Sequence, residues 1–110
     1  MSDCLFCGIV SGAVPAKKVF EDDATYAFED IAPRAPTHVL LVPKGHVDSI
    51  AAAGDAAQIG RLFLAAARVA RDRDLRSYRL IVNNGPDAGQ TVFHLHVHLL
   101  GGRPMAWPPG

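Results

Sequence analysis

Three histidines alternate with apolar residues near the end of this 110-residue chain, at His94, His96 and His98. In a β-strand, successive side chains point to opposite faces, so the three imidazoles would share one face and the intervening apolar residues the other. A neutral imidazole can act as nucleophile, proton carrier or metal ligand, because its ordinary pKa is about 6.5. The alternation therefore predicts a chemical site on one strand face.

Three interpretations of this row compete. Neighbours on one face of a strand lie about 6.6 Å apart, so two adjacent imidazoles could chelate one ion but all three could not. A solvated strand face would more often carry threonine, lysine or glutamate than histidine. The third interpretation is a catalytic row, in which His96 reacts and its neighbours orient it or move protons. We favour the catalytic row.

The segment before the histidines supports this choice. Asn83 ends an apolar run, and Gly89, Gln90 and Thr91 lead into the histidine segment. Gly89 permits close backbone approach, while Gln90 and Thr91 offer neutral donors. Glycine-containing loops are usually simple turns. A loop whose backbone amides lie beside a histidine row is, however, a candidate phosphate-binding loop.

The remaining pattern predicts the elements that position this site. A helix should begin at the N-cap Asp55 and end before Ser77, with an apolar stripe at 3.6-residue spacing, and a short element should cover residues 4–12. Five strands with short connections predict a single α+β domain over residues 1–110 with an antiparallel meander. The expected strands are Lys18–Glu21, Thr25–Glu29, His38–Pro43 (buried on both faces), Tyr78–Asn83 and Val92–Leu100.

Composition excludes several classes of protein. The net charge is zero, which argues against a nucleic-acid partner and an electrostatic membrane anchor. No apolar run approaches the roughly 20 residues of a membrane helix. Met1–Asp3 do not begin a basic region followed by an apolar stretch, so we expect no secretory leader and a cytoplasmic location.

Cys4 and Cys7 have the spacing of a metal-binding pair. Without export signals, this spacing indicates metal ligands or a redox pair before a structural disulfide. Zinc would need two further ligands, for which histidine is available. Two cysteines without a metal, or a strained short-loop disulfide, are the alternatives.

Residues 105–110 are not expected to form a helix. Trp107 stands between Ala106 and a Pro-Pro-Gly end. Because a water-exposed tryptophan is costly, we expect it to pack against a surface.

The residues His94–Leu100 resemble the signature of the histidine triad superfamily, in which histidine alternates with apolar residues and two apolar residues follow. Other segments look like the Hint branch of that superfamily, in order along almost the whole chain: 28–33, 35–38, 43–46, 101–103 and 107–110.

This resemblance implies a HIT-like fold, with a five-stranded antiparallel sheet, one long helix and one short helix. It implies a homodimer in which two sheets join, with the tail 103–110 near the dimer interface or the active site. The implied activity is that of a purine nucleotide-binding hydrolase or nucleotidyl transferase, which cleaves nucleoside phosphoramidates of the AMP–amine type and acyl-adenylates. The nucleotide partner would carry an AMP or GMP moiety, and no organic cofactor is implied.

The resemblance also implies roles for single residues. His96 is the nucleophile that forms a covalent nucleotidyl-histidine, and His98 and His38 support it. His98, or Thr91 acting with it, would protonate the leaving amine.

The nucleotide itself would be bound by a second group of residues. Asp30 would bind the ribose hydroxyls, although capping its own turn is an equal alternative from the residues alone. Ile31 would lie against the base. The phosphate contacts would come from Asn83, Gly89, Gln90 and Thr91.

Related bacterial proteins with the cysteine pair bind zinc through four ligands, which match Cys4, Cys7, His46 and His94. A structural zinc there would leave His96 and His98 as the reactive pair. Thr91 replaces the serine of better-known members and retains the hydroxyl, and Phe93 stands where tyrosine is common.

Two other functions remain open at this point. One is a nucleotide-binding interaction module with incidental hydrolysis. The other is hydrolysis of dinucleoside polyphosphates, against which the Hint-like tail argues.

Overall fold

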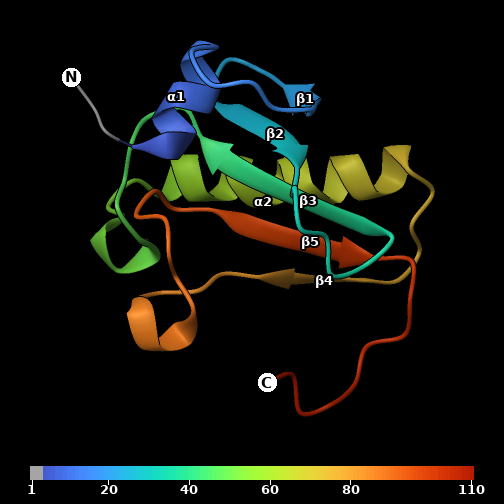
Figure 1. Ribbon diagram of the computed structural model, residues 1–110. Coiled ribbons are helices and arrows are strands. Elements are labelled where there is room, and N and C mark those ends of the chain that lie inside the picture. Colours follow the sequence, from blue (N-terminus) through green and yellow to red (C-terminus); the bar gives the residue numbers. More distant parts are fainter. Residues whose placement is uncertain (1–3) are drawn as a thin grey trace.

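Alternating apolar residues build a five-stranded antiparallel sheet with a helix on each face (Figure 1). The computed structural model describes residues 4–110, so the expectation about Met1–Asp3 lies outside the described residues. The elements are α1 (Leu5–Ser11), β1 (Lys18–Glu21), β2 (Thr25–Glu29), β3 (Thr37–Pro43), the 3-10 turn η1 (Ile50–Ala52), α2 (Ala56–Asp72), β4 (Tyr78–Ile81), the 3-10 turn η2 (Pro86–Ala88) and β5 (Val97–Gly101).

The strand order differs from the expected meander. The sheet runs β1-β2-β3-β5-β4, so the first three strands form a meander and the consecutive strands β4 and β5 form a second pair in reversed order. The chain leaves β3 through α2 and returns as β4, one position away, and β5 fills the gap between them (Figure 1). This order places β3, buried along its whole length as predicted, and the largely buried β5 at the centre of the sheet.

Helix α2 covers one face of the sheet. The carboxylate of Asp55 accepts hydrogen bonds from the backbone N–H groups of Ala57 and Gln58, which is the predicted N-cap. The stripe of α2 that includes Leu62 and Ala66 packs on the apolar residues of the central strands. Truncating a buried leucine such as Leu62 to alanine typically costs about 2–5 kcal/mol of stability.

Helix α1 covers part of the other face. Its seven residues begin after Cys4, whose sulfur accepts the backbone N–H of Cys7, and end at Gly12, which adopts a left-handed φ of 88°. So short a helix is not stable by itself. It is held by packing, because Phe6 and Ile9 are buried against residues of β2 and β3.

The fifth strand begins later than the sequence pattern predicts, at Val97 instead of Val92. The last rungs of the ladder join Val97 to Leu41 and His98 to Ile81, where β4 ends, short of the predicted Asn83. Before these rungs, the backbone N–H of Leu95 turns away to donate to the carbonyl of Val47 at 2.7 Å. His94 and His96 therefore precede the strand and His98 lies in it.

The C-terminal tail runs along β4 but does not bury its tryptophan. Trp107, Pro109 and Gly110 line a cavity of about 460 Å3 with residues 79–83. The guanidinium of Arg79 donates to the carbonyl of Ala106 at 2.9 Å. Trp107 is 82% exposed in this chain, so the expected packing is not made within residues 4–110. None of the helices in this part of the chain is long and apolar enough to cross a membrane.

Candidate active site and metal centre

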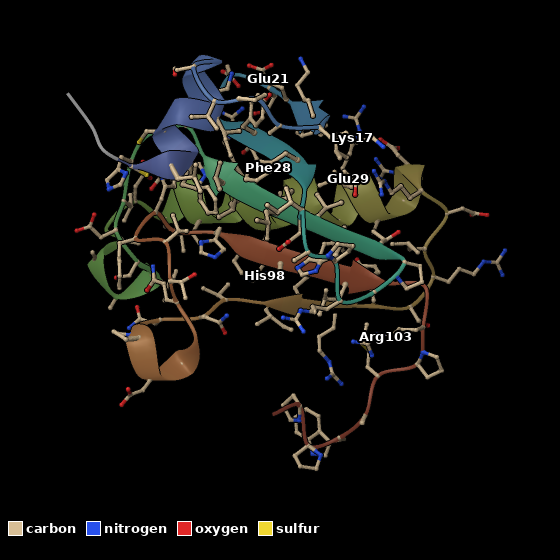
Figure 2. The ribbon with its side chains drawn as sticks, viewed as in Figure 1. Lys17, Glu21, Phe28, Glu29, His98 and Arg103 are labelled. Carbon is tan, nitrogen blue, oxygen red and sulfur yellow. The ribbon has the colours of Figure 1, made fainter. Side chains whose placement is uncertain are left out.

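A cavity of about 360 Å3 lies between α1 and the open face of the sheet. In Figure 2, the side chains of Phe28 and His98, which both line it, lie on the face of the sheet turned away from α2. One part of its wall is apolar, and the other part carries the groups that could do chemistry. The apolar part includes Leu5, Phe6, Ile9, Phe28, Ile31 and Leu40, and the polar part includes Asp30, Thr91, His96 and His98.

His96 is held in one tautomer. Its Nδ1 lies 2.7 Å from the backbone carbonyl oxygen of His94. Because a carbonyl oxygen can only accept, Nδ1 carries the proton and Nε2 keeps its lone pair. Burial lowers the pKa of His96, and the bond to this carbonyl opposes that shift. The ring of Phe6 packs edge-on against the imidazole, with centroids 5.1 Å apart. His96 therefore presents a positioned, neutral nitrogen nucleophile.

His98 is held in the opposite tautomer by a chain of donors. The backbone N–H of Arg34 donates to Nδ1 of His38 at 3.0 Å, so a neutral His38 carries its proton on Nε2. Nε2 of His38 lies 3.0 Å from Nδ1 of His98 and donates to it. The proton of His98 is then on Nε2. Burial, together with the nearby His96 and His38, lowers the pKa of His98 to about 4. His98 is therefore a neutral hydrogen-bond donor at pH 7.

Asp30 contacts both its own turn and the histidines. Its Oδ1 accepts the backbone N–H of Ala32 at 2.8 Å, so the predicted turn cap is present. Its Oδ2 lies 3.3 Å from Nε2 of His38. Asp30 also lines the cavity, beside Ile31, whose side chain is 99% exposed at the rim. Capping and nucleotide binding are thus compatible at Asp30.

The residues expected to cradle phosphate fall into two groups. Thr91 is exposed and lines the cavity. Gln90 is buried instead, and its side-chain amide donates to the carbonyls of Asp48 and Val92 and accepts the backbone N–H of Gly85. The side chain of Gln90 therefore stabilises the loop through its backbone groups and does not face the cavity.

Asn83 and Gly89 meet beside this loop. Gly89 has a left-handed φ of 99°, and a Cβ there would lie 3.7 Å from the amide nitrogen of Asn83. The loop conformation at this point therefore favours glycine and keeps Asn83 next to the backbone that leads to Thr91.

His94 faces a different set of groups, together with Cys4, Cys7 and His46. Nδ1 of His94 lies 3.4 Å from Sγ of Cys4, 3.5 Å from Sγ of Cys7 and 3.1 Å from Nδ1 of His46. Sγ of Cys7 lies 3.3 Å from Nδ1 of His46. Four ligands at zinc bond lengths in a tetrahedron lie about 3.3–3.8 Å apart, so these spacings fit one zinc ion.

The hydrogen bonds of the two imidazoles leave their Nδ1 atoms ready for a metal. Nε2 of His94 donates to the carbonyl of Pro43 at 2.8 Å, and Nε2 of His46 donates to the carboxylate of Asp48 at 2.7 Å. Each Nδ1 then carries a lone pair and lies within hydrogen-bond distance of a cysteine sulfur, which can donate as a thiol or bind a metal as a thiolate. Zinc would take the place of those thiol protons, and the carboxylate behind His46 is a typical outer partner of a zinc-bound histidine.

A second group that could hold a metal, formed by Asp30, His38 and His98, fits less well. The backbone N–H of Arg34 occupies Nδ1 of His38 and places the His38 proton on the nitrogen that would have to bind the ion. Proton sharing suits this group better than metal binding.

Sequence reasoning did not find two parts of the site. Leu5, Phe6 and Ile9 of α1 form a wall of the cavity. Phe6 lies between the two cysteines in the sequence. A metal-binding pair would fix the position of this aromatic ring, and that was the signal available in the sequence. The second missed part is the carboxylate of Asp48, which accepts a hydrogen bond from the proposed metal ligand His46. Its position two residues after His46 was the available signal.

With this geometry established, the comparisons with known proteins identify the family. Residues 11–105 match the family model described as HIT domain, and the chain belongs to this family. It is 43% identical to the adenylylsulfatase HINT1 of Arabidopsis thaliana, covering 99% of this chain and 78% of that protein. It is 42% identical to a 14 kDa zinc-binding protein of Brassica juncea, and the match covers 98% of this chain and 100% of that protein.

A solved structure has the same fold. A HIT family hydrolase from Legionella pneumophila superposes with a TM-score of 0.95 at 45% identity, covering 98% of this chain and 100% of that one. The resemblance inferred from the histidine row and the five-stranded antiparallel fold are both confirmed.

Proposed function

We propose that this protein is a hydrolase of nucleoside 5′-phosphoramidates and acyl-adenylates that works through a covalent nucleotidyl-His96. The observation that carries the proposal is the contact between Nδ1 of His96 and the carbonyl of His94, which leaves Nε2 as a lone-pair nucleophile in a cavity with an apolar wall. The wall suits a purine base, and Asp30 and Ile31 at the rim suit the ribose and the base of an AMP or GMP moiety.

The reaction would occur in two displacements at phosphorus. In the first, Nε2 of His96 forms a bond to the phosphorus, and the bond from phosphorus to the amine breaks with its electron pair on the amine. In the second, water attacks the phosphorus and breaks its bond to His96. One water is consumed overall, and its hydroxyl goes to the nucleotide and its hydrogen to the amine.

The other polar groups would stabilise charge and position the substrate. The Nε2–H of His98 would donate to a phosphoryl oxygen or to the leaving atom. Thr91, Gly89 and Asn83 would hold the phosphoryl oxygens through a hydroxyl, a backbone N–H and an amide. Fixed donors aimed at developing charge are the usual source of rate enhancement in such transfers.

A second candidate substrate comes from the Arabidopsis relative, whose name indicates action on adenylyl sulfate. Adenylyl sulfate presents the same adenylyl group with sulfate as the leaving group. The same attack by His96 would release sulfate, and no extra proton would be needed on so weak a base.

We also propose a structural zinc held by Cys4, Cys7, His46 and His94. The ligand spacings and the two lone-pair Nδ1 atoms support it, and so does the similarity to a zinc-binding protein. Such a closed four-ligand site would stabilise the fold and would not contact the reacting atoms. Metal analysis of untagged protein should give close to one zinc per chain, and the Cys7→Ser protein should give almost none.

A homodimer completes the proposal. β4 is an edge strand, and an open edge is normally covered. A partner there would also cover the exposed Trp107 of the tail.

The central test is turnover of an adenosine phosphoramidate by the wild-type protein and by His96→Gly. Loss of a nucleophile should lower kcat by about 10^4-fold or more. The control is Ser49→Ala, a polar side chain that does not line the cavity and makes no capping bond, and it should turn over as the wild type does. Full turnover by His96→Gly would refute the nucleophile, and tight nucleotide binding by a wild-type protein with negligible turnover would favour the binding-module alternative.

A further inference from the structure

We propose that the cluster Cys4, Cys7, His46 and His94 positions the nucleotide cavity, so that zinc binding there docks α1 and raises the affinity for a purine mononucleotide. This inference rests on the proposed nucleotide and zinc sites and adds a coupling between them. Cys4, Cys7 and His46 would be positioning residues, because they act on the nucleotide through other groups.

Helix α1 belongs to both sites. Cys4 caps it and Cys7 lies in its first turn, and their sulfurs face the imidazoles of the cluster. Leu5, Phe6 and Ile9 of the same helix form a wall of the nucleotide cavity. Any shift of the cysteines relative to the sheet therefore moves that wall.

His94 is the second connection. Its ring faces the cysteines through Nδ1, while its carbonyl oxygen holds the proton on Nδ1 of His96. A metal bound to the ring fixes the residue whose carbonyl sets the tautomer of the nucleophile. The two functions of His94 use different atoms, so both can be satisfied together.

Phe6 links the same residues by packing. Its ring lies edge-on to His94 with centroids 6.1 Å apart, and edge-on to His96 at 5.1 Å. It also packs on Phe28 of β2, at 5.4 Å. Phe6 thus contacts a ligand of the cluster, the nucleophile and the cavity wall.

Helix α1 depends on its contacts with the rest of the chain. The helix has seven residues, too few to be stable in isolation, and Leu5 is 48% exposed. Without a metal, the sulfurs and the two imidazoles are joined by thiol hydrogen bonds of 3.3–3.5 Å, and a thiol is a weak donor. Loss of the metal should therefore increase the population in which α1 is undocked.

The experiment measures the affinity for AMP by calorimetry and the hydrogen exchange of the amides of residues 6–11. Three states of the wild-type protein are compared: loaded with zinc, stripped by a chelator that is then removed, and reloaded. Stripping should raise the Kd for AMP about tenfold, as expected if the docked state falls to about one tenth of molecules, and reloading should restore it. Exchange of the α1 amides should rise and fall in parallel.

Two variants separate the coupling from damage to the cavity. His46→Ser removes a ligand that does not line the cavity, so its effect can reach AMP only through the cluster, and zinc should fail to restore its affinity. Ser49→Ala is the matched control in the same loop, since the Ser49 hydroxyl makes no capping bond to the turn that follows. It should bind zinc and AMP as the wild type does.

An unchanged Kd and unchanged exchange after proven loss of zinc would overturn the coupling and leave both sites standing. Failure of the wild-type protein to bind zinc would overturn the metal site and the coupling together, with the His96 reaction still measurable. If the loaded protein does not bind AMP, the proposed function fails, and the exchange of residues 6–11 alone then reports whether zinc docks α1.

Discussion

His38 and His98 lie diagonally across the β3–β5 ladder, where His38 pairs with Leu100 and His98 with Leu40, and Nε2 of His38 lies 3.0 Å from Nδ1 of His98. The backbone N–H of Arg34 fixes the direction of this hydrogen bond by occupying the far nitrogen of His38. A loop amide therefore determines which nitrogen of His98 carries its proton. His38 is buried, and its Nε2 also lies 3.3 Å from the Asp30 carboxylate, so the same N–H faces a second acceptor at a longer distance.

Removing the donor at position 38 should release His98 from this tautomer. We expect His38→Leu to lower kcat for a phosphoramidate by about 100-fold, within the range typical of positioned proton-handling groups. His38→Gln, whose amide nitrogen can reach the position of Nε2, should retain more activity. The tautomer of His98 is measured directly from its ring 15N shifts by NMR. Equal kcat values for the leucine and glutamine variants, with unchanged 15N shifts, would contradict this role.

The depressed pKa of His98 should also make stability depend on pH. Burial holds its pKa at about 4, against 6.5 as its ordinary value. Between these pH values the unfolded chain binds a proton at His98 that the folded chain does not bind. The free energy of unfolding should therefore fall as pH drops from 6.5 toward 4, and the contribution of His98 should be constant below that.

Urea unfolding at several pH values between 4 and 7 tests this dependence. The His98→Asn protein lacks the titrating group, so its free energy of unfolding should fall less steeply over the same range. Comparing the two proteins removes the contributions of the titrating groups that do not contact His98. Equal slopes in the two proteins would argue against a depressed pKa at His98.

Much of the fold could be predicted because its signals are local. The N-cap at Asp55, the apolar stripe of α2 and the fully buried third strand follow from short patterns of residue type. The strand order could not be read in the same way. Insertion of β5 between β3 and β4 depends on contacts between segments far apart in the chain.

The site shows the same division between local and distant information. The histidine spacing correctly places apolar residues such as Leu95 and Val97 in the core. It does not show that His94 turns toward Cys4, because the histidines before Val97 lie outside the strand. The burial of Gln90 was also not predictable, since its partners include the carbonyl of Asp48, 42 residues earlier.

Thr91 allows a direct test of the hydroxyl at the cavity. Thr91→Ser keeps the hydroxyl and removes a methyl group, so kcat should change less than about threefold if the hydroxyl is the functional group. Thr91→Val keeps the shape and removes the donor, and kcat should fall by about tenfold, the equivalent of one hydrogen bond. Steady-state kinetics with one phosphoramidate distinguishes the two. A larger loss in the serine variant than in the valine variant would assign the role to the methyl group.

The exposed edge of the sheet leads to a prediction about assembly. The tail beside β4 carries Trp107, a large aromatic side chain that is mostly exposed next to this edge strand. Sedimentation at micromolar concentration should therefore show a dimer, and Trp107→Ser should shift its dissociation to concentrations about tenfold higher, equivalent to about 1.4 kcal/mol. Leu64 is the matched control, because it is also largely exposed but lies beside Phe20 of β1, at the opposite edge. Leu64→Ser should leave the dimer unchanged. A monomeric wild-type protein, or equal shifts in the two variants, would show that the β4 edge and the tail do not form the interface.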